Sequence, residues 1–244
     1  MNITWEELKF FLTELKDLPV SESLELNENE KENKKENFAV STGCDIESWV
    51  FYPERVKNIE IVEKTVNFFK SQKVSFMWPV YDGGEKILEE GGLLYAGSLT
   101  GMIYENYSFE KSFFQTANYD EWARTAWHGF GGGYDDVPEN YFALVKAFSE
   151  NPKFSLYTYK INNKNAGSFM LVDEPDGAGV YYFATIPEER RKGIARLMMK
   201  EICNLSRGKK ILLQATPMGL PFYKNFGFKE LCKIPVYSDS SDVF

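Results

Sequence analysis

Histidine and cysteine are the residues that this sequence has least of. Its 244 residues include one histidine, His128, and three cysteines, Cys44, Cys203 and Cys232. A structural zinc site of the Cys/His type needs four such ligands close together, so we expect no metal site. An odd number of widely spaced cysteines also provides no disulfide framework, and it indicates a protein of the reducing cytoplasm.

Long apolar runs are missing as well. No run approaches the roughly 20 residues that cross a bilayer. Residues 1–9 are acidic and polar, which does not resemble a secretory signal. We therefore expect no membrane partner and no export.

A surplus of positive charge is the third thing that the sequence lacks. It holds 28 Lys and Arg residues against 36 Asp and Glu, a net charge of −8. The deficit lies in residues 1–110, with 11 basic and 21 acidic residues, whereas residues 111–244 have 17 and 15. Apart from a basic turn at 190–192 there is no evident basic patch, so nucleic acid is not an expected partner.

What the sequence does contain is typical of a globular α/β protein, with 43% hydrophobic and 16% aromatic residues. Apolar periodicity and turn residues predict helices over 2–17, 59–71, 85–90, 120–128 and 138–149. They predict strands over 21–26, 38–42, 47–52, 74–80, 93–102, 113–116, 154–160, 166–173, 179–186 and 209–215. Residues 27–37 contain only Asn, Glu and Lys and are expected to form an exposed loop, with a linker at 105–112.

Residues 179–208 are the most informative stretch, because an apolar strand, a basic turn and an amphipathic helix follow one another. The helix is expected to begin near Gly193 and to carry an apolar face of Ile194, Leu197, Met198, Ile202 and Leu205. A helix N-terminus exposes unpaired N–H groups and a partial positive charge, and Gly193 and Ala195 let a phosphate come close. Arg190, Arg191 and Lys192 would add charge suited to a diphosphate. An ordinary turn with a solvated basic face has the same spacing, so both interpretations remain open at this point.

The next segment changes the balance between them. After the strand at 209–215 comes a short helix with Tyr223, followed by Gly227 and Phe228. The pattern Arg/Gln-x-x-Gly-x-Gly/Ala is met by Arg190, Gly193 and Ala195, and Tyr-x-x-x-Gly-Phe is met downstream. Together they resemble the GNAT superfamily of N-acetyltransferases over about residues 112–238. The resemblance implies an α/β (α+β) fold with a mixed central sheet flanked by helices.

The resemblance also implies a chemistry: direct transfer of an acetyl group from acetyl-CoA to an amine of a small molecule or peptide. Backbone N–H groups of Arg191, Lys192, Gly193, Ile194 and Ala195, beside Arg190, would bind the CoA diphosphate. The backbone of Phe183, Ala184, Thr185 and Ile186 would pair with the pantetheine arm. Tyr223 would be the general acid that protonates the departing thiolate, and a packing tyrosine is the alternative.

The amine acceptor and the general base are not singled out. Asp135, Asp136 and Glu139 lie where GNAT folds line the acceptor pocket, although a helix cap explains Asp136 equally well. His128 is more simply structural, and the Gly131–Gly133 run is interpreted as a hinge or lid. Trp127, Phe130 and Tyr134 would wall either the acceptor site or the core. Cys203 is expected to pack inside its helix.

The N-terminal half echoes the C-terminal half. A shift of 135 residues aligns Arg55 with Arg190 and Gly92 with Gly227. Asn58 then replaces Gly193, Glu60 replaces Ala195 and Leu88 replaces Tyr223. We expect tandem GNAT-like domains, a degenerate one at 1–108 and an acetyltransferase at 109–244. The alternatives are a non-catalytic acyl-CoA-binding or interaction protein and an enzyme for a bulkier acyl donor; oligomeric state is open.

Overall fold

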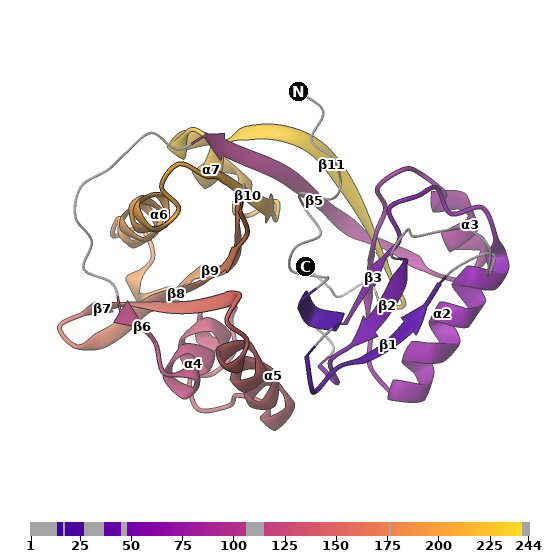
Figure 1. Cartoon of the computed structure of the whole chain (residues 1–244), viewed down its shortest axis with the longest axis horizontal. Helices are drawn as coiled ribbons and strands as arrows, with labels where there is room; N and C mark the ends of the chain where they lie inside the picture. Colours follow the sequence, from indigo (N-terminus) through magenta and orange to yellow (C-terminus); the bar gives the residue numbers. More distant parts are fainter. Residues whose placement is uncertain are drawn as a thin grey trace. The chain divides into compact units, whose positions relative to one another are not determined.

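The computed structural model describes residues 14–16, 18–26, 37–44, 48–105, 115–175 and 177–240 (Figure 1). The chain divides into two compact units. The first unit comprises Met1–Gly101, Gln214–Tyr223 and Glu230–Phe244, and the second comprises Met102–Leu213 and Lys224–Lys229. The helix expected at 2–17, the loop at 27–37 and the linker at 105–112 lie largely outside the described residues.

The first unit is a sheet covered by helices. Strands β1 and β2 pair antiparallel, as do β2 and β3, whereas β3 and β4 are parallel. Helices α2 and α3 pack beside each other. Their apolar faces bury Val62, Phe69 and Leu88 against Phe76 and Trp78. The element bounds are β1 Glu22–Glu25, β2 Phe38–Ser41, β3 Trp49–Phe51, α2 Ile59–Gln72, β4 Met77–Pro79 and α3 Glu85–Glu90.

The second unit has a sheet with helices on both faces. Strands β6, β7, β8 and β9 pair antiparallel in order, and β9 pairs parallel with β10. Figure 1 shows α4 and α5 on one face of β7–β9 and α6 on the other. The element bounds are β6 Gln115–Thr116, α4 Tyr119–Gly129, α5 Glu139–Glu150, β7 Phe154–Ile161, β8 Lys164–Asp173, β9 Gly177–Thr185, α6 Ile194–Leu205 and β10 Lys210–Ala215.

Two long strands and one helix complete the fold: β5 Leu94–Glu105, α7 Leu220–Phe226 and β11 Lys229–Ser238. Within the first unit, β11 pairs antiparallel with β4, with Tyr237 opposite Trp78. Lys233 of β11 also donates to the Thr100 hydroxyl of β5 at 2.8 Å. A strand from the end of the chain is therefore built into the unit that contains its beginning.

The predicted internal repeat is visible in where the elements begin. Helix α2 begins at Ile59 and α6 at Ile194, and α3 begins at Glu85 and α7 at Leu220. Strands β5 and β11 begin at Leu94 and Lys229. All three pairs keep the same spacing of 135 residues, so the order helix, strand, helix, strand occurs twice in register.

Most predicted elements are confirmed, with local differences. Helix α6 begins after Gly193 as expected, but Leu197 and Leu205 are 44% and 42% exposed. The buried face instead includes Met199 and Cys203 beside Ile194, Met198 and Ile202. Residues three and four positions apart both lie on one helical face. The sequence alone therefore did not show which of two adjacent apolar residues is buried.

The β7–β8 hairpin has a two-residue turn, Asn162–Asn163, which is shorter than the gap between the strands predicted over 154–160 and 166–173. Asn162 and Asn163 have φ values of 49° and 62°. Two consecutive left-handed residues form the two-residue turn that suits the twist of a hairpin, and asparagine tolerates this conformation.

In the described part of the chain, no helix has both the length and the hydropathy to cross a membrane.

Candidate active site

The turn between β9 and α6 presents an open helix N-terminus. A short 3-10 helix, Pro187–Glu189, follows β9, and Arg191 and Gly193 then take left-handed φ values of 62° and 83°. Gly193 is the N-cap of α6 and supplies no side-chain cap. The space where its Cβ would stand has no atom within 4 Å. The first N–H groups of α6 therefore keep their hydrogen-bonding capacity beside the positive end of the helix dipole.

The three basic side chains of this turn differ in what they contact. Arg190 donates from Nε to the Thr185 carbonyl at 3.2 Å and from Nη2 to the Gly129 carbonyl at 2.9 Å. Lys192 forms an ion pair with Glu189 at 3.1 Å. Arg191 has no hydrogen-bond or ion-pair partner within the described residues. The predicted turn residues lie together, but the Arg190 guanidinium is directed at backbone carbonyls.

Strand β9, which carries three of the four predicted pantetheine-binding residues, is irregular. Its pairing with β8 passes from Met170–Tyr181 to Ser168–Ala184, so one extra residue stands in β9. Tyr182 lies in this bulge with a φ of 50°. The fourth predicted residue, Ile186, follows the strand and donates its backbone N–H to the Ala166 carbonyl at 3.1 Å.

The other edge of β9 is paired only near its beginning. Strand β10 pairs with Gly177, Ala178 and Gly179, while β9 continues to Thr185. The Thr185 hydroxyl is buried and has no hydrogen-bond partner in the described part of the chain. The later half of β9 therefore offers backbone and side-chain polar groups that β10 does not use.

Tyr223 lies on α7 and is 8% exposed. Burial raises the pKa of its phenol well above the ordinary value of about 10. The ring of Phe222 meets it edge-on at 5.3 Å between centroids, and a Cβ at Gly219 would come within 3.1 Å of its ring. Tyr223 is thus held as a protonated phenol. In the division of the chain by contacts, Tyr223 belongs to the first unit and the basic turn belongs to the second.

His128, at the end of α4, has both ring nitrogens occupied. Nδ1 lies 2.9 Å from the Gly132 carbonyl, and Nε2 lies 3.0 Å from the Glu188 carboxylate. The Gly132 carbonyl and then Glu188 raise the pKa of the imidazole, against an opposing effect of burial. These contacts link the end of α4 to the 3-10 helix after β9, and the structural interpretation of His128 stays a prediction.

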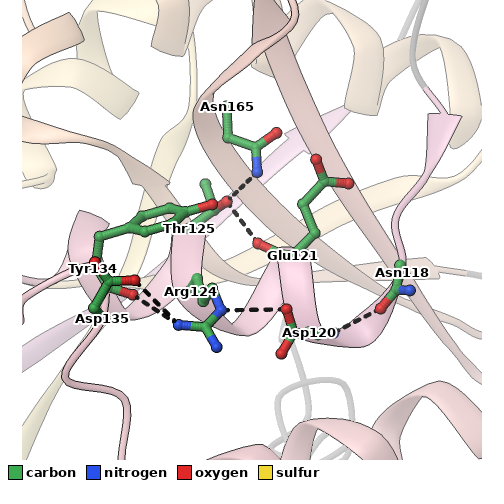
Figure 2. A network of polar contacts seen from close by, with 8 residues as sticks. All are labelled: Asn118, Asp120, Glu121, Arg124, Thr125, Tyr134, Asp135 and Asn165. Atoms are coloured by element: carbon green, nitrogen blue, oxygen red, sulfur yellow. Dashed lines mark hydrogen bonds and ion pairs between the residues drawn. The ribbon is translucent and has the colours of Figure 1, made fainter.

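A polar network organises the connection between α4 and α5 (Figure 2). Arg124 pairs with Asp120 at 3.2 Å and with Asp135 at 3.5 Å, and it donates to the Tyr134 carbonyl. The Asp135 carboxylate is 90% exposed. Asp136 does not cap α5, because the N-cap is Pro138. Glu139 is exposed in the first turn of that helix.

The glycine run between these helices is packed at two of its three positions. A Cβ on Gly132 would collide with the Trp127 indole, and one on Gly133 would collide with the Asp136 carboxylate. Gly131 has open space and a φ of 105°. Of the aromatic residues considered for the acceptor site, Phe130 and Tyr134 are 59% and 41% exposed.

A cavity of about 670 Å³ lies beside these groups, within the second unit. Its walls come from α4, the β7–β8 hairpin and the segment after β9. Most of its lining residues are polar or charged, among them Glu121, His128, Asn165, Glu188 and Glu189. Sequence reasoning missed Gly129 and Glu188, because their partners lie about 60 residues away and no local spacing signals such pairs.

Comparison with known proteins identifies a family for residues 152–230. The sequence matches the Acetyltransferase (GNAT) domain family over residues 152–230. Those residues form a GNAT acetyltransferase domain. The match spans β7 to the start of β11, and it contains both the basic turn and Tyr223. A search of curated protein sequences gave no match.

Solved structures similar to this chain extend the likeness to both halves. A GCN5-related N-acetyltransferase from Kribbella flavida is 12% identical, with a TM-score of 0.64 over 98% of this chain and 96% of its own. A tandem GNAT protein from the clavulanic acid biosynthesis pathway is 10% identical, with a TM-score of 0.52 over 91% of this chain and 83% of its own. A functionally unknown conserved protein from Staphylococcus epidermidis is also 10% identical, with a TM-score of 0.58 over 78% and 83%. These likenesses show the fold, and the nearly full-length ones agree with the repeat seen in the elements.

Proposed function

We propose that this protein is an N-acetyltransferase that moves an acetyl group from acetyl-CoA to an amine of a small molecule or peptide. The observation that carries the proposal is the uncapped, left-handed Gly193 at the N-terminus of α6, inside the GNAT domain. The GNAT family uses acetyl-CoA as its acyl donor. We assign the active copy to residues 109–244 and a degenerate copy to residues 1–108.

The basic turn has the features that a diphosphate needs. The N–H groups from Arg191 to Ala195 lie at the positive end of the α6 dipole, and Gly193 leaves room for a close approach. The Arg191 side chain is available as an additional cation. A charge-assisted hydrogen bond from a fixed backbone N–H is stronger than a neutral one, so this turn suits the most highly charged part of CoA.

The later half of β9 suits the pantetheine arm. That arm contains two amide groups, which can hydrogen-bond to a strand edge as an added strand does. We assign this role to Phe183, Ala184, Thr185 and Ile186, which follow the last residue of β9 that pairs with β10. The unpartnered Thr185 hydroxyl gives this edge one further hydrogen-bonding group.

The reaction that we propose is a direct transfer. The neutral amine attacks the thioester carbonyl carbon, a C–N bond forms and the C–S bond breaks. Tyr223 donates its proton to the departing sulfur, and the proton released by the new amide nitrogen restores the phenol. The Tyr223 phenol is protonated at neutral pH, and because burial raises its pKa it is a weaker acid than an exposed tyrosine, so the proposed proton transfer depends on its position beside the departing sulfur. None of the three cysteines forms a disulfide, which is compatible with the reducing, cytoplasmic setting that we propose.

Calorimetric titration with acetyl-CoA tests this proposal, using wild type, Gly193→Glu and Gly208→Glu. Gly208 is a matched control, because it also has a left-handed φ and open space, but it lies beyond the other end of α6. We expect one site per chain that Gly193→Glu abolishes and Gly208→Glu retains. An amine screen that follows thiol release then identifies acceptors.

Each other outcome has a definite meaning. Two sites per chain would show that the N-terminal copy is not degenerate. Absence of binding in the wild type would overturn the enzyme assignment and leave an interaction protein with a GNAT fold. Binding without turnover for any amine class would favour a non-catalytic acyl-CoA-binding protein.

A further inference from the structure

Arg190 is the first residue of the predicted phosphate-binding pattern, yet its guanidinium contacts protein backbone. One arm reaches back to the Thr185 carbonyl at the end of β9, and the other reaches the Gly129 carbonyl at the end of α4. The last carbonyls of a helix have no partner inside the helix, and the negative end of its dipole favours a cation. Arg190 therefore satisfies an acceptor that α4 leaves open.

The end of α4 is itself fixed against β9 by close packing. Gly129 is buried, and a Cβ placed on it would stand only 2.6 Å from the Cβ of Ala184. A side chain at position 129 would push the two elements apart. The Gly129 carbonyl is thus held at a constant distance from the strand that leads into the basic turn.

A second contact links the same two elements. Nε2 of His128 lies 3.0 Å from the Glu188 carboxylate in the 3-10 helix that precedes Arg190. Contacts between the last two residues of α4 and the segment 184–190 therefore occur at three points. After Arg190, the backbone passes through the left-handed Arg191 before it reaches Gly193 at the start of α6.

We propose that Arg190 is a positioning residue, which fixes the backbone of the CoA-binding turn from the end of α4 and does not itself bind phosphate. The inference rests on the proposed function for the identity of the ligand. A guanidinium holds its N–H groups on separate nitrogens in a rigid planar fork, whereas the three N–H donors of a lysine ammonium share one nitrogen on a flexible stem and fix the two carbonyls less firmly. Arg190 thus acts by fixing the backbone conformation of the turn. The positive charge that faces the phosphate comes from Arg191 and from the N-terminus of α6.

The test compares Arg190→Gln and Arg190→Lys with Arg196→Gln, by acetyl-CoA titration and by backbone amide hydrogen exchange of residues 186–196. Arg196 is the matched control, because it lies in the first turn of the same helix over the Phe226 ring, at 5.8 Å. We expect both Arg190 variants to speed exchange in the ligand-free turn and to weaken acetyl-CoA binding about tenfold. The kcat at saturating acetyl-CoA and the Arg196→Gln values should remain close to wild type.

Gly129→Ala completes a double-mutant cycle with Arg190→Gln. If Arg190 acts through the Gly129 carbonyl, the two changes weaken binding by no more together than one does alone. Should Gly129→Ala fail to fold, acetyl-CoA titration and hydrogen exchange of Arg190→Gln and Arg190→Lys decide the inference without the cycle.

Several results would overturn the inference. Additive losses in the cycle, an affinity that Arg190→Lys retains, or unchanged exchange in Arg190→Gln would each show a direct contact with phosphate or no role. If wild type binds no acetyl-CoA, the proposed function fails separately, and hydrogen exchange alone decides whether Arg190 fixes the turn.

Discussion

Asn58 and Gly193 stand at equivalent positions of the two repeats and begin their helices in different ways. Asn58 has an extended backbone with a φ of −118°, and its amide oxygen accepts from the Glu60 N–H at 2.9 Å. Gly193 is left-handed and has no side chain to offer. The first repeat thus satisfies by itself a donor that the second repeat leaves open, which supports the proposed degeneracy of the first repeat independently of the charge of Glu60.

Replacement of this cap has a defined consequence. Asn58→Ala should lower the free energy of unfolding by about 1 kcal/mol, the usual value of an N-cap. Urea denaturation measures that change. Acetyl-CoA stoichiometry should stay at one, because Glu60 still places a carboxylate in the first turn; a second site in this variant would contradict the account.

Tyr223→Phe separates catalysis from binding. The variant keeps the ring that packs against Phe222 and loses only the proton donor. We expect kcat to fall at least about 100-fold, in the range of general acid catalysis, with acetyl-CoA affinity unchanged. Steady-state kinetics with any accepted amine measure this, and undiminished turnover would return Tyr223 to a packing role.

Tyr237 makes stability sensitive to alkaline pH. Burial, and a hydrogen bond that its hydroxyl donates to Glu89 at 3.0 Å, raise its pKa to about 12. An unfolded tyrosine titrates near 10. The contribution of Tyr237 is therefore complete below pH 10 and is lost as pH rises toward 12. Thermal unfolding between pH 9 and 12 should show this loss in wild type and in the control Tyr134→Phe, a position that is 41% exposed, but less of it in Tyr237→Phe.

Cys203 should behave as an inert core residue. Burial raises the pKa of its thiol to about 12, so the reactive thiolate is scarce at pH 8. We expect alkylation mapped by mass spectrometry to leave Cys203 unmodified until the chain unfolds. Cys203→Ala should retain turnover, and a large loss of kcat would call for a chemical role.

Removal of residues 1–108 should not leave a stable domain. Strand β11 would lose its partner β4, and the buried side chains of Val236 and Tyr237 would become exposed. We expect the 109–244 fragment to aggregate. Size-exclusion chromatography measures this aggregation. Co-expression of 1–108 should rescue it, and a monomeric, fully active 109–244 fragment would contradict this prediction.

Local pattern was sufficient for much of the fold. The basic turn, the start of α6 after Gly193 and the positions of α2 and α3 follow from glycine placement and apolar period. The two-residue turn at Asn162 was placed within a longer loop, because both lengths fit the same polar run. Leu197 and Leu205 were assigned to the core, because their spacing does not say which flank of the helix faces the sheet.

Contacts between distant segments explain what the sequence could not provide. The Arg190–Gly129 and His128–Glu188 contacts each join residues about 60 positions apart, and their partners have no shared motif. The pairing of β11 with β4 joins Val236 to Pro79. Such contacts are determined by how whole elements pack, so spacing along the chain gave Arg190 a phosphate-binding role where the structure directs it at carbonyls.

The pairing of β4 with β11 also bears on how the protein is made. A ribosome releases Met77–Pro79 long before it has synthesised residues 229–238. The first unit therefore remains incomplete until residues 229–238 have been synthesised, although N-terminal domains usually fold first. Slow, non-local completion of this kind predicts a nascent chain that depends on chaperones until β11 has paired with β4.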